Sequence, residues 1–166
     1  MLEDKFWKET DKAIPGWMSK EEAQFLLENV EGKFYVEIGV AYGKSLSLVR
    51  HHYPDMEVVG IDLINHGVEK KVNNVEIIYG NANELNSRFI DGSIDTLFVD
   101  GDHQYDGCLS DMVRWYNKVK KGGTIMIHDY NRKTREHEGV TQAVNVLMPM
   151  LKDFKYVDCI AAGQTH

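Results

Sequence analysis

Residues 34–48 read FYVEIGVAYGKSLSL, and this segment decides how the rest of the chain is interpreted. Its first five residues, Phe34 to Ile38, form a short run rich in β-forming side chains, which predicts a buried strand. Gly39 and Gly43 follow, and the apolar spacing after them predicts a helix. A strand that enters a helix through a glycine turn is typical of a nucleotide-cofactor site, because glycine lets a ligand approach the backbone and the helix start offers free N–H groups. An ordinary turn that binds nothing is the alternative for this segment alone.

The size and composition of the chain indicate one globular domain. It has 166 residues, of which 43% are apolar and 10% are aromatic, enough for a sizeable core. We expect a single domain over residues 1–166, with residues 1–33 as a helical lead-in. Within this lead-in, Ser19 and Glu22 have the spacing of a capping box and precede a helical apolar face.

Charge and cysteine usage argue against several classes of protein. The net charge is -7 and the pI is near 5.5, which argues against nucleic acid and anionic membranes as main partners. No apolar run approaches membrane-spanning length, and Met1 to Thr10 lack the apolar core of a signal peptide. Cys108 and Cys159 make no disulfide framework or zinc motif, so we expect free thiols in a cytoplasmic protein.

The rest of the chain alternates predicted strands with predicted helices. We expect strands over residues 58–61, 75–79, 94–99, 124–127, 154–157 and 159–162, and helices over residues 108–119 and 139–151. Residues 121–123 are expected to form a turn and residues 132–138 a charged loop. The helix over 108–119 is expected to bury Leu109, Met112, Val113 and Tyr116. This alternation predicts an α/β fold, a doubly wound Rossmann-like and mostly parallel sheet with helices on both faces.

Polar residues follow several of these strands, at the edge where parallel sheets bind ligands. Asp62 ends the second strand, nineteen residues after Gly43, where a carboxylate can accept hydrogen bonds from ribose hydroxyls. Asn81 to Asn83 follow the third strand and offer amide groups to an adenine edge, with a plain Asx turn as the alternative. Together with the glycine turn, these residues predict a nucleoside site.

Carboxylates and imidazoles gather after the fourth and fifth strands. Asp100, Asp102 and His103 follow the fourth strand, and His128 and Asp129 follow the fifth. Groups of this kind at this density predict general-base catalysis, a divalent metal, or both. Aspartate also caps helices and forms turns, and we prefer that interpretation for Asp102. We expect function from Asp100, His103 and Asp129.

Four pieces of the chain together resemble the class I S-adenosylmethionine-dependent methyltransferases. They are residues 37–45 (EIGVAYGKS), Asp62, residues 98–105 (FVDGDHQY) and residues 122–129 (GGTIMIHD). The Asp-Gly-Asp-His piece resembles a small subgroup akin to the macrolide-sugar O-methyltransferases, and the resemblance covers roughly residues 15–151. It implies a seven-stranded sheet with a reversed final pair of strands.

The resemblance also implies S-adenosylmethionine as cofactor and a set of site residues. The implied cofactor-binding residues are Glu37, Gly39, Val40, Ala41, Tyr42, Gly43, Ser45, Asp62, Leu63, Asn81, Ala82, Asn83, Asp100 and Gly101. The implied catalytic residues are His103, as general base, and Asp129. The implied magnesium ligands are Asp100 and the pair after the fifth strand, which here is His128 and Asp129, although a hard cation prefers oxygen to imidazole.

We therefore expect an S-adenosylmethionine-dependent methyltransferase that acts on an oxygen of a small hydroxylated molecule, such as a sugar or glycoside. A nicotinamide-dependent oxidoreductase is the first alternative, although the loop is Gly-x-x-x-Gly and the dinucleotide motif is Gly-x-Gly-x-x-Gly. A non-catalytic cofactor-binding protein and a metal-dependent hydrolase are the others. The sequence leaves open whether the acceptor atom is oxygen or nitrogen and whether the chain forms a homo-oligomer.

Overall fold

A mostly parallel sheet of seven strands forms the middle layer of the computed structural model, which describes residues 2–166. The strands are β1 (Phe34–Ile38), β2 (Glu57–Asp62), β3 (Glu76–Tyr79), β4 (Ile94–Val99), β5 (Val119–Ile127), β6 (Leu151–Val157) and β7 (Ile160–Thr165). Their order in the sheet is β3-β2-β1-β4-β5-β7-β6. The first five strands pair in parallel, and β7 is antiparallel to both β5 and β6. The predicted fold class is confirmed, including the reversed pairing at the end of the chain.

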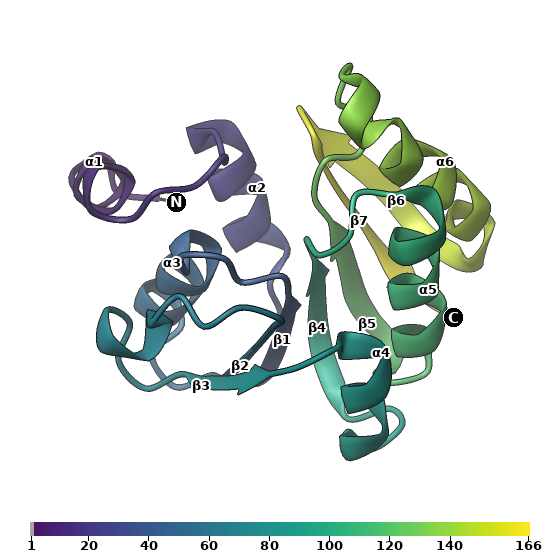
Figure 1. Ribbon diagram of the computed structural model, residues 1–166, viewed down its shortest axis with the longest axis horizontal. Coiled ribbons are helices and arrows are strands. Elements are labelled where there is room, and N and C mark those ends of the chain that lie inside the picture. The colour runs from purple at the N-terminus through teal and green to yellow at the C-terminus, as the bar shows by residue number, and fades with distance from the viewer. Residues whose placement is uncertain (1) are drawn as a thin grey trace.

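Helices cover both faces of the sheet (Figure 1). On one face lie α1 (Asp4–Ala13), α2 (Lys20–Asn29) and α3 (Lys44–His52), and on the other lie α4 (Ala82–Leu85), α5 (Tyr105–Tyr116) and α6 (Glu138–Leu147). Short 3-10 helices are η1 (Val68–Lys70), η2 (Asn86–Arg88), η3 (Arg135–His137) and η4 (Met148–Met150). The sheet thus separates two apolar cores, one around Leu26 and Leu46 and one around Trp115 and Ile125. Within residues 2–166, we find no helix whose length and apolar character would let it cross a lipid bilayer.

The helical lead-in is attached through the predicted capping box. Ser19 Oγ accepts a hydrogen bond from Glu22 N at 3.1 Å, and Ser19 N donates to Glu22 Oε2 at 2.7 Å. Glu22 Oε1 also accepts a hydrogen bond from Cys159 N at 3.2 Å, in the turn between β6 and β7. The carboxylate that caps α2 therefore also connects the lead-in to the C-terminal hairpin.

The helix predicted over residues 108–119 lies earlier and buries a slightly different face. It is α5, which begins at Tyr105 and ends at Tyr116. The predicted Met112 is buried and the predicted Leu109 and Tyr116 are partly buried against the same core, but Val113 is 55% exposed and Trp115 is buried in its place. Both positions fit the helical spacing, and the large Trp115 side chain gains more from burial than Val113 does.

The turn predicted at residues 121–123 is part of strand β5 instead. The register between β4 and β5 shifts between Ile94 and Thr96, and Gly122 has a φ of +75°. The strand therefore passes through the glycine pair as an irregularity of the bulge type and does not end there.

The last predicted helix is shorter than the sequence indicated. It was expected over residues 139–151, but α6 ends at Leu147 and Pro149 lies in η4. Proline lacks the N–H that a continuing helix needs, so the chain leaves the helix before it. Leu151 then opens β6, and both final strands are longer than predicted.

Candidate active site

The site is organised by the neighbouring parallel strands β1 and β4, whose connections leave toward opposite faces of the sheet (Figure 1). Open α/β sheets bind ligands in the crevice at such a point. Gly39 N donates a hydrogen bond to Ile61 O at 2.8 Å, and Asp100 N donates to Ile38 O at 2.8 Å. The glycine loop after β1 and the Asp100 loop after β4 therefore start at the same edge, side by side.

The glycine loop has a backbone that few residues adopt. Gly39, Ala41 and Gly43 have φ angles of +84°, +46° and +86°. A Cβ atom on Gly39 would lie 2.0 Å from the carbonyl oxygen of Asp100. Glycine is needed here both for the positive φ and for the close approach of the two loops. Ala41 adopts the left-handed region at a cost of about 1–2 kcal/mol, a strain that is found most often at functional sites.

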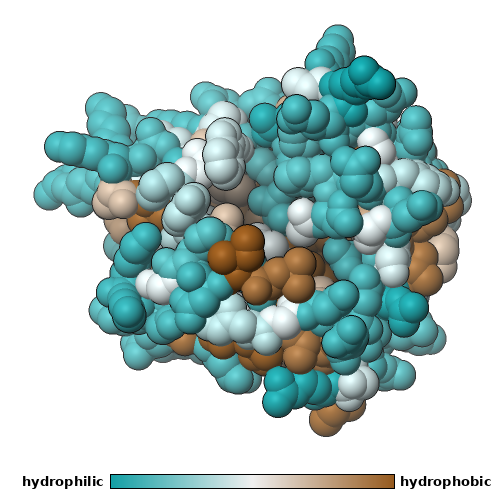
Figure 2. All heavy atoms as spheres, in the orientation of Figure 1, coloured by the Kyte–Doolittle hydropathy of each residue, from teal (hydrophilic) through white to brown (hydrophobic). Residues whose placement is uncertain are grey.

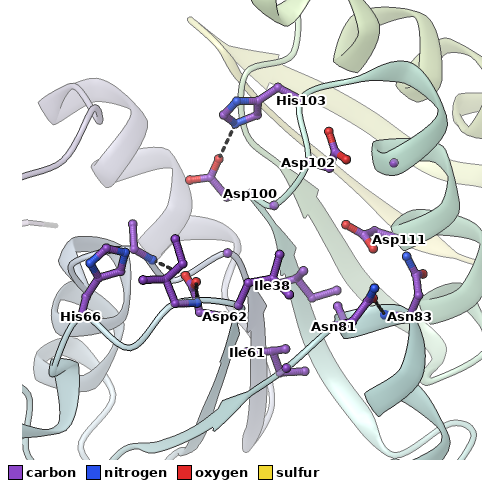
Figure 3. Close-up of a pocket in the computed structure, with 18 residues that line it drawn as sticks. Ile38, Ile61, Asp62, His66, Asn81, Asn83, Asp100, Asp102, His103 and Asp111 are labelled. Carbon is purple, nitrogen blue, oxygen red and sulfur yellow. Dashed lines mark hydrogen bonds and ion pairs between the residues drawn. The ribbon is translucent and has the colours of Figure 1, made fainter.

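A first cavity of about 470 Å³ opens beside this loop. Figure 3 shows an apolar floor of Ile38 and Ile61, with polar side chains around it: Asp62, His66, Asn81, Asn83, Asp100, Asp102, His103 and Asp111. Leu63 and Ile64 also line it and are 74% and 60% exposed, and Figure 2 shows apolar surface next to a hollow on this side of the molecule. Apolar walls with a few polar groups are typical of small-molecule sites.

The side chain of Asp62 is hydrogen-bonded to the glycine loop, which the sequence did not indicate. Its Oδ2 accepts hydrogen bonds from Val40 N at 2.9 Å and Ala41 N at 2.7 Å, and its Oδ1 accepts one from Ile64 N at 2.8 Å. The carboxylate therefore holds the glycine loop in place. Because a carboxylate has about four lone-pair sites, it can still accept a hydrogen bond from a ligand.

Asp111 is a cavity residue that the sequence analysis missed. It extends from α5 toward the first cavity and is only 5% exposed. Burial and the nearby Asp102 raise the pKa of Asp111 to about 6. The available signal was a carboxylate inside the apolar stripe of a helix, where an acidic side chain is seldom buried without a partner or a function.

A second cavity, of about 530 Å³, lies on the other side of the glycine loop. It shares Gly39, Ala41, Asp100 and His103 with the first cavity, so these residues form the boundary between the two. The lead-in contributes Trp17, which is 76% exposed. Its other aromatic, polar and charged lining residues include Tyr42, Lys44, Ser45, His128, Asp129, Arg132 and His137.

Glu37 lies beneath the glycine loop and lines neither cavity. It has no exposed surface, and its carboxylate accepts hydrogen bonds from Tyr35 Oη at 2.7 Å and Ser45 Oγ at 2.5 Å. Burial raises the pKa of Glu37 to about 8. In this structure the carboxyl group supports the loop from below, and direct contact with a cofactor stays a prediction.

The raised pKa of Glu37 predicts a pH-dependent stability. The native state holds the proton more tightly than the unfolded chain, so the contribution of Glu37 to the free energy of unfolding is fully present below pH 4.5 and is lost as pH rises through about 8. The slope from one such group is at most about 1.4 kcal/mol per pH unit. Glu37→Gln should therefore show a shallower decline than wild type between pH 5.5 and 8 in urea unfolding. The exposed Glu57→Gln serves as control, and parallel slopes in all three proteins would contradict the assignment.

The acidic and imidazole side chains predicted from the strand ends do come together. His103 Nε2 lies 3.0 Å from Asp129 Oδ2 and 3.7 Å from Asp100 Oδ1. The carboxylates of Asp100 and Asp129 raise the pKa of His103 to about 9. This arrangement favours the protonated imidazole, so His103 can act as a base, or offer a lone pair to a cation, only after that proton is displaced.

The loop that carries His103 is fixed by Asp102. Asp102 Oδ1 accepts a hydrogen bond from Gln104 N at 2.8 Å, which confirms the turn role preferred for this residue. The N-cap of α5 is Gln104, and no side chain makes the capping hydrogen bond. His103 therefore does not cap the following helix, and its side chain is directed at Asp100 and Asp129.

His128 is a buried imidazole between carboxylates. Its Nδ1 lies 3.2 Å from Asp100 Oδ1 and its Nε2 lies 3.6 Å from Glu22 Oε2. Burial disfavours the charged form, yet Asp100 and Glu22 raise the pKa of His128 well above its usual range. The site thus contains a cationic side chain where the resemblance implied a metal ligand.

The three residues implied as magnesium ligands lie close together but do not suit that ion. Ligand atoms of Asp100, His128 and Asp129 all lie within 4.8 Å of one another. However, His128 is occupied by Asp100 and Glu22, and the Arg132 guanidinium pairs with Asp129 Oδ1. Magnesium requires mostly oxygen ligands in a near-octahedral arrangement, which two carboxylates already paired with cations do not offer.

Most of the cofactor-binding residues inferred from the sequence surround the two cavities. Glu37 and Gly43 are the two that line neither cavity. The residues that do are Gly39, Val40, Ala41, Tyr42, Ser45, Asp62, Leu63, Asn81, Ala82, Asn83, Asp100 and Gly101. Besides Asp111, three further residues were not predicted as part of the site: Glu22 comes from the lead-in, Arg132 from the loop after β5 and His137 from η3.

The seven-stranded sheet with an antiparallel β7, the glycine loop after β1 and the carboxylate at the end of β2 are the features that the resemblance to class I methyltransferases implied. Residues 36–130 match the family model described as "Methyltransferase domain". This match covers more than half of the chain, and the chain belongs to that family.

One relative and several solved structures are similar to this chain. The uncharacterised protein R132 of Acanthamoeba polyphaga mimivirus is 34% identical in an alignment 153 residues long, which covers 79% of this chain and 69% of the viral protein. A structure from Klebsiella pneumoniae described as an O-methyltransferase has a TM-score of 0.77 at 17% identity, over 100% of this chain and 92% of that one. A structure from Staphylococcus aureus described as a caffeoyl-CoA O-methyltransferase has a TM-score of 0.76 at 18% identity, over 100% and 93% of the two chains.

A third similar structure contains ligands. It is the MycE methyltransferase of the mycinamycin biosynthetic pathway in complex with Mg, SAH and mycinamycin VI, with a TM-score of 0.71 at 15% identity. The alignment covers 96% of this chain and 54% of MycE. At these identities, the three structures establish the shared fold.

Proposed function

We propose that this protein transfers a methyl group from S-adenosylmethionine to an oxygen atom of a small hydroxylated acceptor. The observation that carries the proposal is the pair of cavities that meet at Gly39, Ala41, Asp100 and His103. A reaction between a cofactor and an acceptor needs two adjoining sites with the reacting groups at their boundary. The family membership of the chain and the S-adenosylhomocysteine bound in MycE support the same conclusion.

The first cavity fits the nucleoside part of the cofactor. Asp62 lies at the end of β2, where it can accept a hydrogen bond from a ribose hydroxyl while it holds the glycine loop. The exposed apolar side chains of Leu63 and Ile64 offer a surface for the adenine ring. Asn81, Asn83 and Asp111 supply polar groups on the opposite side of the cavity (Figure 3).

Gly39 lies directly against the backbone of Asp100, where a Cβ would not fit, and this contact forms the boundary between the two cavities. S-adenosylmethionine supplies an electrophilic methyl group on a sulfonium. Such a group needs little activation, so the main tasks of the protein are to position the acceptor and to remove its proton. His103 and Asp129, which both line the acceptor side, are the groups placed to do this.

The lining of the second cavity supports a small hydroxylated acceptor. Trp17 and Tyr42 offer aromatic faces, and Lys44, Asp129 and Arg132 offer charged and hydrogen-bonding groups. Aromatic faces combined with polar groups suit a ring that carries hydroxyls, such as a sugar or a glycoside. Because the magnesium set is not suited to its ion, no step of this proposal depends on magnesium.

Asp62→Ala tests the cofactor site. We expect the affinity for S-adenosylhomocysteine, measured by calorimetry, to fall by about 1–3 kcal/mol, the scale of a hydrogen bond to a charged group. Since Asp62 also holds Val40 and Ala41, the loss alone would not identify a ribose contact. Comparing the binding of adenosine with that of its 2′,3′-dideoxy analogue shows whether Asp62 contacts the ribose hydroxyls. Removing the hydroxyls should weaken binding to wild type much more than to Asp62→Ala, and equal losses in both proteins would exclude the contact.

The whole function is tested with cofactors and acceptors in parallel. S-adenosylhomocysteine should raise the melting temperature, because a ligand that binds only the native state stabilises it, whereas NAD should not. Transfer of label from methyl-labelled S-adenosylmethionine to a panel of sugars, glycosides and amines then identifies the acceptor atom. A response to NAD without any response to S-adenosylhomocysteine would overturn the proposal in favour of an oxidoreductase.

A further inference from the structure

Two imidazoles and one carboxylate converge on a single point of the second cavity. His137 Nε2 lies 3.4 Å from Asp129 Oδ2, and His103 Nε2 lies 3.0 Å from the same oxygen. The three ligand atoms all lie within 4.8 Å of one another. The residues come from three separate segments, the loop after β4, the loop after β5 and η3, and all three line the second cavity.

The contacts within this cluster are not ordinary hydrogen bonds. Nε2 of His103 is buried and has no hydrogen-bond partner, although Asp129 Oδ2 is only 3.0 Å away. Two ligand atoms bound to one cation at about 2.0–2.1 Å are separated by about 2.9–3.0 Å in octahedral geometry and about 3.3–3.4 Å in tetrahedral geometry. The observed separations of 3.0 Å and 3.4 Å fit atoms that share a cation.

Neighbouring groups orient His103, Asp129 and His137 so that they can share a cation. Thr134 Oγ1 lies 2.6 Å from His137 Nδ1, so a proton on Nδ1 can be shared with the hydroxyl and the lone pair of Nε2 is left for a ligand. The Arg132 guanidinium pairs with Asp129 Oδ1, which leaves Oδ2 facing the imidazoles. Asp129 also has a φ of +59°, a strained conformation that aims its carboxylate. Metal-binding histidines almost always have such a partner on the second nitrogen.

We propose that His103, Asp129 and His137 bind a divalent transition-metal ion of the zinc type, with its remaining coordination positions open toward the acceptor cavity. Two imidazoles and one carboxylate favour zinc, cobalt or iron over magnesium, which prefers oxygen. This site differs from the set of Asp100, His128 and Asp129, because it shares only Asp129 and uses the opposite carboxylate oxygen. A cation here would lower the pKa of an acceptor hydroxyl that occupies an open position. The role in methyl transfer rests on the proposed function, whereas the metal site itself does not.

The test is metal binding by untagged protein freed of metal by chelation. Zinc binding is measured by calorimetry, and cobalt binding is followed by its visible absorption, which reports the ligand geometry directly. We expect one site that binds zinc with micromolar or tighter affinity and that millimolar magnesium does not displace. His137→Ala should weaken zinc binding on the order of 100-fold, and Thr134→Val, which keeps all three ligands, should weaken it by about tenfold.

The control is His51→Ala, which removes an exposed histidine that stacks on Phe6, away from both cavities. It should leave zinc affinity unchanged. Absence of zinc binding, displacement by magnesium, or equal affinity of wild type and His137→Ala would each overturn the site. Calorimetry with S-adenosylhomocysteine on the same samples separates the two proposals, since zinc binding without cofactor binding would sustain the metal site and reject the methyltransferase.

Discussion

Gly39→Ala is expected to weaken productive binding of the cofactor and to destabilise the fold. The added Cβ would lie 2.0 Å from the carbonyl oxygen and 2.4 Å from the carbonyl carbon of Asp100. Both are backbone atoms, so the glycine loop and the Asp100 loop must move apart. The φ of +84° adds strain of about 1–2 kcal/mol, and overpacking costs about 1–3 kcal/mol more. Because both cavities share this boundary, a displacement of about 1 Å should reduce turnover on the order of 10²-fold.

The matched control for this variant is Gly92→Ala. Gly92 has a φ of +71°, but a Cβ atom there would meet no other atom within 4 Å. The Gly92→Ala variant therefore has the strain of the left-handed conformation but no clash between its Cβ and another atom. Urea unfolding and calorimetry with S-adenosylhomocysteine should show a small loss of stability with normal binding for Gly92→Ala, and losses of both for Gly39→Ala. Unchanged affinity in Gly39→Ala would mean that the contact between the two loops does not shape the site.

The strands around the site could be predicted because each is a short apolar run between turn signals. β1 and β4 have the bounds expected from the sequence, Phe34–Ile38 and Ile94–Val99. The start of β5 could not be predicted, because Lys-Gly-Gly is locally a turn, and it belongs to a strand only because Val119 before it and Thr124 after it both pair with β4. Val113 was predicted to be buried in α5 and Trp115 was not, for a similar reason: both positions fit the helical spacing, and the neighbouring elements decide which of them is buried.

Some residues of the candidate site could likewise be predicted from the sequence, and others could not. Residues that directly follow strands, such as Asp62, Asp100 and Asp129, were predictable because the carboxyl ends of parallel strands meet at one edge. Glu22 and His137 reach the same place from the lead-in and from η3. Their positions depend on tertiary packing, which leaves no periodic signal in the sequence. Glu37 was correctly placed at a strand end, yet the alternation of side chains along β1 buries it together with Tyr35.

His103→Ala is expected to reduce turnover by about 10²–10⁴-fold, the usual contribution of a general base. His103 lies at the boundary of the two cavities, and its imidazole is directed at Asp129 Oδ2 and Asp100 Oδ1. Because it makes no capping hydrogen bond to α5, the melting temperature should fall only through the loss of its contacts with Asp100 and Asp129, and the affinity for S-adenosylhomocysteine should barely change. The measurement uses an acceptor identified by screening, with His51→Ala as the control. Near-wild-type turnover in His103→Ala would remove this residue from the catalytic machinery.

The loss of turnover in His103→Ala is expected whether His103 is a general base or a metal ligand. The effect of replacing His137 distinguishes these two roles. If His103 acts only as a base, His137→Ala should retain turnover, because His137 is not needed to take a proton from the acceptor. If both imidazoles bind one cation, each single variant should lose turnover to a similar extent. The double variant should then lose little more, since groups that act as a unit are strongly non-additive. Losses that multiply in the double variant would instead assign His103 and His137 to independent tasks, with proton removal left to His103.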